Sequence, residues 1–126
     1  MNKDYTSVEQ SQKLIKLGID KTTSDMHYDK HPLENYYSPI PIIGKYSEIH
    51  DELPCWSLAA LLNVLPVSCD DEQHCLALIN HNPNEKTEWL CAYEDDKGNL
   101  MMECYADNQI DACVAMIDKL HEQNLL

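Results

Sequence analysis

The feature that most constrains this chain is a strand, turn, strand and helix pattern near its C-terminus. Residues 88–94 and 99–106 have strand character, and the segment Asp95 to Gly98 between them predicts a type I turn with glycine in the left-handed position. A helix over residues 109–123 follows, because Asn108 is a favourable N-cap and apolar side chains recur at helical spacing, at Ile110, Cys113, Val114, Ile117 and Leu120. With the apolar run 74–80, these segments predict an antiparallel sheet and an amphipathic helix.

A first helix is predicted over residues 7–17. Thr6 can cap its N-terminus, and Glu9, three residues later, completes a capping box. Gly18 can then adopt the left-handed conformation that ends many helices.

A second helix is predicted to begin near Pro54 and to end before Pro66. Its body, residues 56–65, is apolar on nearly all sides. Such a helix is buried centrally or in a dimer interface, so the sequence is compatible with a homodimer through residues 55–65.

The segment between these helices is not helical. Pro32, Pro39 and Pro41 rule out a long helix over residues 20–46, and Pro39 to Ile43 is extended or forms an edge strand. The order helix, extended segment, helix, strands, helix favours an α+β fold. We expect a single domain over residues 1–126, with a three- or four-stranded antiparallel sheet and about three helices packed on one face.

The charge is strongly acidic and unevenly distributed. The net charge is −13, there is no arginine, and residues 51–126 carry fifteen acids against three lysines. Because Lys and Arg supply most phosphate contacts, we expect neither direct nucleic-acid binding nor docking on an anionic membrane. The acids either form a solvated face that keeps the protein soluble or attract a basic protein partner.

The cellular location is predicted to be the cytoplasm. The first dozen residues are polar and lack the pattern of a secretory signal, and no apolar run has the length of a membrane helix. The six cysteines are then read as reduced, mostly buried thiols rather than as a disulfide framework.

Cys55 and His74 form the one candidate catalytic pair. Cys55 lies at the predicted start of the second helix, where the helix dipole lowers a thiol pKa, and His74 could act as its base. The Cys55–Trp56 dipeptide is found in papain-like peptidases, but the signature residues and spacing of that family are absent. The alternative is a buried, inert cysteine.

No metal or cofactor is predicted. His27 and His31 have i, i+4 spacing, but Pro32 makes a regular helix there doubtful. Cys69, His74 and Cys75 lack a second ligand pair at zinc-site spacing. The three glycines form no phosphate-binding loop.

Two groups of residues are candidates for contacting a partner. Tyr36, Tyr37 and Trp56 form an aromatic set near the proline-rich segment, and Asp70, Asp71 and Glu72 form an acidic loop. The alternative for the aromatic set is that it covers the core, which needs large residues because the chain has no phenylalanine.

Three segments carry a resemblance: residues 7–19, residues 53–66 with the run Leu53-Pro54-Cys55-Trp56-Ser57, and residues 110–126. Together they resemble small uncharacterised proteins of gut Bacteroidetes genomes and of their phages and mobile elements. The resemblance implies no activity, cofactor or catalytic residue.

No residue pattern names a reaction or a ligand, and three hypotheses therefore stay open. The first is a non-enzymatic acidic interaction module of phage or mobile-element type. The second is an acidic inhibitor that mimics nucleic acid, which predicts carboxylates about two residues apart along a strand, at the spacing of backbone phosphates. The third is a thiol hydrolase that uses Cys55 and His74.

Overall fold

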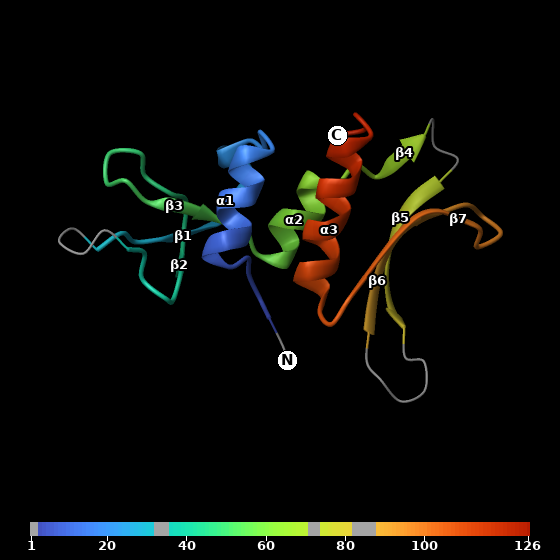
Figure 1. The fold of residues 1–126 in the computed structure, drawn as a ribbon, viewed down its shortest axis with the longest axis horizontal. Coiled ribbons are helices and arrows are strands. Elements are labelled where there is room, and N and C mark those ends of the chain that lie inside the picture. The colour runs from blue at the N-terminus through green and yellow to red at the C-terminus, as the bar shows by residue number, and fades with distance from the viewer. Residues whose placement is uncertain (1–2, 32–35, 71–73, 82–87) are drawn as a thin grey trace. The chain divides into compact units, whose positions relative to one another are not determined.

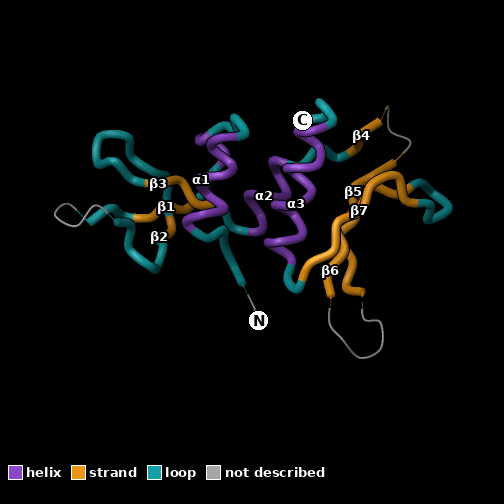
Figure 2. The backbone as a smooth tube through the Cα atoms, in the orientation of Figure 1, coloured by secondary structure: helices purple, strands orange, loops and turns teal. Residues whose placement is uncertain are grey.

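A computed structural model describes residues 3–31, 36–70, 74–81 and 88–126 (Figure 1). The chain divides into two compact units, residues 4–63 and residues 1–3 with 64–126. Helices, strands and loops are distinguished in Figure 2.

The unit of residues 64–126 is a four-stranded sheet with one helix. All neighbouring strands are antiparallel, in the order β4 (Ser68–Asp70), β5 (His74–His81), β6 (Glu88–Glu94) and β7 (Leu100–Ala106). Helix α3 (Gln109–Glu122) packs against β6 and β7. The predicted hairpin and the helix that follows it are thus confirmed.

The turn and the helix cap of this unit use the side chains that the sequence indicated. Gly98 has a φ of 82°, and the Asp95 carboxylate accepts hydrogen bonds from the backbone N–H groups of Lys97 and Asn99. Asn108 Oδ1 accepts a hydrogen bond of 2.8 Å from the backbone N–H of Asp111. The apolar stripe of α3 is buried along its whole length, at Ile110, Cys113, Val114, Ile117 and Leu120.

The unit of residues 4–63 contains a second sheet. Its strands are antiparallel, in the order β2 (Ile42–Ile43), β1 (Met26–Tyr28) and β3 (Leu53–Cys55). Helix α1 (Val8–Lys16) packs against β3, and a short 3₁₀ helix, η1 (Lys21–Thr23), leads into β1. Tyr28, Leu53 and Cys55 form the centre of a buried apolar cluster.

The prediction for the start of α1 was wrong by one residue. Ser7, not Thr6, is the N-cap, and Gln10, not Glu9, completes the capping box. The Thr6 hydroxyl is used elsewhere, because it contacts the Ser11 hydroxyl and accepts the backbone N–H of Trp56. The predicted end is confirmed, since Gly18 has a φ of 87°.

The prediction for the start of the second helix was also wrong. Leu53 to Cys55 pair with β1 as strand β3, and helix α2 (Leu58–Val64) begins after Ser57, whose hydroxyl accepts the backbone N–H of Ala60. Pro54 fits an edge strand as well as a helix start, because neither position needs its missing N–H. Ala59 and Asn63 are exposed, so α2 is not buried on all sides. A homodimer through this region stays a prediction.

The α+β fold class is confirmed, with a four-stranded antiparallel sheet in residues 64–126. The pairing of a second sheet was not predicted, but the edge strand expected within residues 39–43 is confirmed by β2. Because α1 packs against β3 and α3 against β6 and β7, a common face for all helices stays a prediction, as does a single domain. Among the described residues, every helix is too short or too polar to cross a membrane.

Candidate functional site

The three predicted aromatic contacts occupy different environments. Tyr36 is 48% exposed, whereas Tyr37 is half-buried and packs against the apolar cluster of the first unit. Trp56 is fully buried, and its Nε1–H donates to Thr23 Oγ1 at 2.9 Å. Trp56 is therefore part of the core, and its assignment to an exposed binding face was wrong, because its ring fills the interior.

The predicted acidic loop falls mostly outside the described residues. Asp70 is the last residue of β4, and Asp71 and Glu72 are not described. The contact role of this loop stays a prediction.

Exposed apolar side chains concentrate in residues 36–49. Of the eleven large apolar side chains that are exposed among the described residues, five lie in this segment: Tyr36, Ile40, Ile42, Ile43 and Ile49. Ile43 is 86% exposed and Ile49 is 91% exposed. Ile42 and Ile43 form β2, which is an edge strand of its sheet. We call these five side chains the isoleucine surface.

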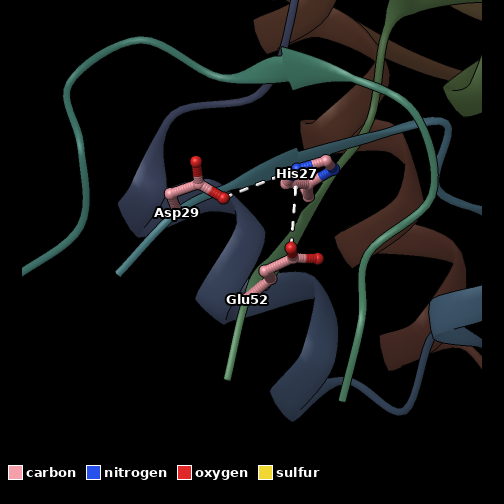
Figure 3. A group of neighbouring side chains, drawn as sticks. All are labelled: His27, Asp29 and Glu52. Carbon is pink, nitrogen blue, oxygen red and sulfur yellow. Dashed lines mark ion pairs between the residues drawn. The ribbon is translucent and has the colours of Figure 1, made fainter. Parts of the chain in front are cut away.

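Three side chains with metal-ligating atoms converge beside this segment (Figure 3). His27 lies on β1, Asp29 follows that strand, and Glu52 precedes β3. His27 Nε2 lies 3.5 Å from Asp29 Oδ1 and 3.7 Å from Glu52 Oε1. The pairing of β1 with β3 thus brings together residues that are far apart in the sequence.

The surroundings of this cluster fix two of its side chains. His27 Nδ1 lies 2.9 Å from the carbonyl oxygen of Gly44, and Glu52 Oε2 accepts the backbone N–H of Ser47. The side chains of His27 and Glu52 are each 13% exposed, whereas that of Asp29 is 52% exposed. The cluster is therefore half enclosed and open on the Asp29 side.

A cavity of about 490 Å³ adjoins the cluster, and Asp29 and Glu52 are among the residues that line it. On its wall, the rings of His31 and Tyr36 stack with centroids 5.4 Å apart and an interplanar angle of 15°. Lys30 also lines the cavity, and its Nζ lies 2.9 Å from Asp51 Oδ2. The arrangement offers a cation two carboxylates beside an aromatic wall.

Cys55 does not have the environment that a catalytic thiol needs. It lies on β3 rather than at a helix start and is fully buried. Its Sγ lies 3.4 Å from the backbone oxygen of Thr6, and burial raises the pKa of the thiol. His74 begins β5 in the other unit. Burial and a raised pKa both reduce the thiolate fraction on which thiol catalysis depends.

The carboxylate pattern expected of a nucleic-acid mimic is missing from the described strands. Strand β6 carries Glu88 and Glu94, which are six residues apart, and β7 carries only Glu103. Strand β5 contains no acid. Within the strands that the structure describes, no two carboxylates stand two residues apart.

The sequence missed the three-residue cluster because its members do not form a local motif. The sequence spacing pairs His27 with His31, four residues on, whereas its neighbours in the structure are Asp29 and Glu52. The alternation His27, Tyr28, Asp29 places both outer residues on one side of an extended chain, which is a usable but weak signal. Nothing local points to Glu52.

No protein-family model, no curated protein and no solved structure matches this chain. The resemblance of residues 7–19, 53–66 and 110–126 to proteins of gut Bacteroidetes and their mobile elements stays a prediction.

Proposed function

We propose that this chain is a non-enzymatic interaction module that binds a basic protein partner through the isoleucine surface. The observation that carries the proposal is the exposure of Ile40, Ile42, Ile43 and Ile49, at 70%, 47%, 86% and 91%. Contiguous exposed apolar patches mark interaction sites, and the proposal is that these side chains, which all lie within residues 40–49, contribute to one. Fully burying one such side chain contributes about 1.5–3 kcal/mol.

The charge of the chain supports a basic partner. The net charge is −13, and residues 4–63 alone carry nine acids against five lysines. Such a field attracts basic surfaces and raises their association rate.

We also propose a cytoplasmic location and an accessory role of the phage or mobile-element kind. The cysteines whose side chains the structure describes, at 55, 75, 91, 104 and 113, are all free thiols, as is usual in a reducing compartment. The raised pKa and full burial of Cys55 support a role other than thiol catalysis.

The experiment is a pull-down from host lysate with three forms of the full chain: wild type, the double variant Ile43→Ser with Ile49→Ser, and Val67→Ser. Val67 is 80% exposed and lies in the other unit, so it is the matched control for an exposed apolar residue. A partner recovered by wild type is then titrated with each form. We expect roughly 100-fold weaker binding by the double variant, since it loses two apolar contacts, and unchanged binding by Val67→Ser.

Added salt tests the basic character of the partner, because the attraction between exposed charges is screened. We expect the association rate to fall as salt rises. Equal binding by all three forms would exclude the isoleucine surface, and binding that ignores salt would exclude a basic partner.

A further inference from the structure

We propose that His27, Asp29 and Glu52 bind a divalent transition-metal ion, with Zn²⁺ as the reference ion. The proposal concerns a site beside the isoleucine surface and does not depend on the protein partner. It rests on the direction of the His27 ring, on the distances between ligand atoms, and on what surrounds them (Figure 3).

The hydrogen bond of His27 to Gly44 decides which ring nitrogen faces the carboxylates. A backbone carbonyl can only accept, so His27 Nδ1 must donate its proton to the Gly44 oxygen 2.9 Å away. In the neutral ring, Nε2 then carries a lone pair, and this lone pair faces Asp29 and Glu52. Three acceptors that face one another repel unless a proton or a metal ion lies between them.

The distances favour the metal ion. A protonated Nε2–H would donate to a carboxylate oxygen at about 2.7–3.2 Å, but His27 Nε2 lies 3.5 Å and 3.7 Å from the two oxygens. In a tetrahedral site with metal–ligand bonds of about 2.0–2.2 Å, neighbouring ligand atoms are about 3.3–3.6 Å apart. The two distances from His27 Nε2 lie at or just above that range, and the Asp29 and Glu52 oxygens lie within 4.8 Å of each other. The two His27 distances therefore suit an ion at the centre better than direct hydrogen bonds.

The second shell and the access route are also those of a metal site. Histidine ligands commonly donate their other ring N–H to a backbone carbonyl, as His27 does to Gly44. Glu52 keeps Oε1 toward the centre while Oε2 accepts the backbone N–H of Ser47. The adjoining cavity, which Asp29 and Glu52 help to line, provides an entry path and room for a water ligand.

The chemical identity of the donor atoms indicates which class of metal ion the site would prefer. One imidazole nitrogen with two carboxylate oxygens suits Zn²⁺ and other first-row divalent ions, whereas Mg²⁺ and Ca²⁺ prefer oxygen ligands throughout. Two carboxylates and a dication leave the site neutral, which reduces the repulsion between Asp29 and Glu52.

The test is a Zn²⁺ titration of the full chain against a chromophoric chelator, followed by a Co²⁺ titration read by visible absorption. Every form carries Cys75→Ser, because Cys75 is an exposed thiol and thiols bind these ions. The test variants are His27→Ala and Glu52→Gln, and the control is His121→Ala, which removes an exposed histidine of α3. Glutamine keeps an oxygen that can accept the N–H of Ser47, so Glu52→Gln distinguishes a lost ligand from a lost fold.

We expect stoichiometric Zn²⁺ binding that weakens by at least about 100-fold in both test variants, since losing even an outer-shell partner costs 10–100-fold. The control should bind as the parent does, and bound Co²⁺ should give the absorption of a low-coordinate nitrogen and oxygen site. Absent binding, or binding equal in all forms, would overturn the proposal. Since no protein partner enters this assay, its result is separate from that of the pull-down.

Discussion

The two units of this chain build their cores by different means. In residues 64–126, elements that follow one another in the sequence are neighbours in space: β5 pairs with β6, β6 with β7, and α3 packs back on both. In residues 4–63, short strands pair across long intervals, and Met26 lies opposite Cys55. The unit of residues 64–126 is therefore the easier one to predict from the sequence, because its contacts are local.

The polar content of the two cores differs as well. All three fully buried polar residues among those described, Thr6, Ser11 and Ser24, lie in residues 4–63. Buried hydroxyls need partners, and Thr6 contacts both the Ser11 hydroxyl and the backbone N–H of Trp56. Hydrogen bonds between distant segments thus stabilise the short strands of residues 4–63. In residues 64–126, the apolar face of α3 stabilises the long strands.

The largest expected effect is in the apolar core of α3. Ile117→Ala should lower the free energy of unfolding by about 2–5 kcal/mol, because Ile117 is fully buried and truncation leaves a cavity. Ile49→Ala is the matched control, since Ile49 is 91% exposed, and we expect a change below about 0.5 kcal/mol. Urea unfolding measures both. Equal losses would mean that the buried face of α3 does not stabilise its unit.

The structure of residues 64–126 could be predicted well from the sequence, and the reason is physical. The strand β6 was predicted with its observed bounds, Glu88–Glu94, and the Asn108 cap and the Gly98 turn were predicted residue by residue. Each of these features depends on side chains within a few positions, such as an amphipathic period or a left-handed glycine. Local features of this kind can be recognised without knowing the fold.

In the other unit helix α1 was predicted, but the strand pairing was not, because its signals are short or ambiguous. Strand β1 has three residues, too few to show a period of two. Pro54 fits both a helix start and an edge strand, and only its pairing with His27 decides between them. The same pairing brings Glu52 toward His27, so the candidate site could be predicted only if the pairing of β1 with β3 were already known. Of the predicted contacts, Tyr36 is exposed and Trp56 is not.

The second prediction tests the polar core of residues 4–63. Thr6→Val keeps the shape of the side chain but leaves the Trp56 N–H without its acceptor, so we expect a loss of about 1–3 kcal/mol in the free energy of unfolding. Thr22→Val is the control, because the Thr22 hydroxyl makes its bond to Asp20 at the exposed surface. Chemical denaturation compares the two variants. A loss as small as that of Thr22→Val would show that buried hydroxyls do not hold this unit.

The third prediction concerns the helix cap. Asn108→Ala should cost about 1 kcal/mol, within the usual range of 0.5–2 kcal/mol, because Asp111 loses the acceptor for its backbone N–H. Asn108→Ser should restore most of the stability, since serine caps about as well as asparagine and adds no charge beside the Asp111 carboxylate, to which Asn108 Nδ2 donates. Thermal unfolding can follow both. If serine is no better than alanine, the cap is not what Asn108 contributes.

The smallest expected effect compares one exposed carboxylate from each unit. The pKa of Asp20 is lowered by the backbone N–H and hydroxyl of Thr22, and that of Asp95 by the backbone and side-chain N–H groups of Asn99. A lowered folded-state pKa means that each group stabilises the fold above its ordinary value of 3.8 and loses this contribution as pH falls through the lower folded-state pKa.

The double variant Asp20→Asn with Asp95→Asn should therefore lose stability less steeply than wild type as pH falls below about 4. The amide oxygen of asparagine can still accept the same N–H groups, so both turns can persist without the charge. Unfolding midpoints measured in steps of pH from 5 to 2 check this, and the two single variants divide the effect between the units. Parallel profiles would show that neither turn contributes to acid sensitivity, whereas a change confined to one single variant would assign the acid-labile contacts to that unit alone.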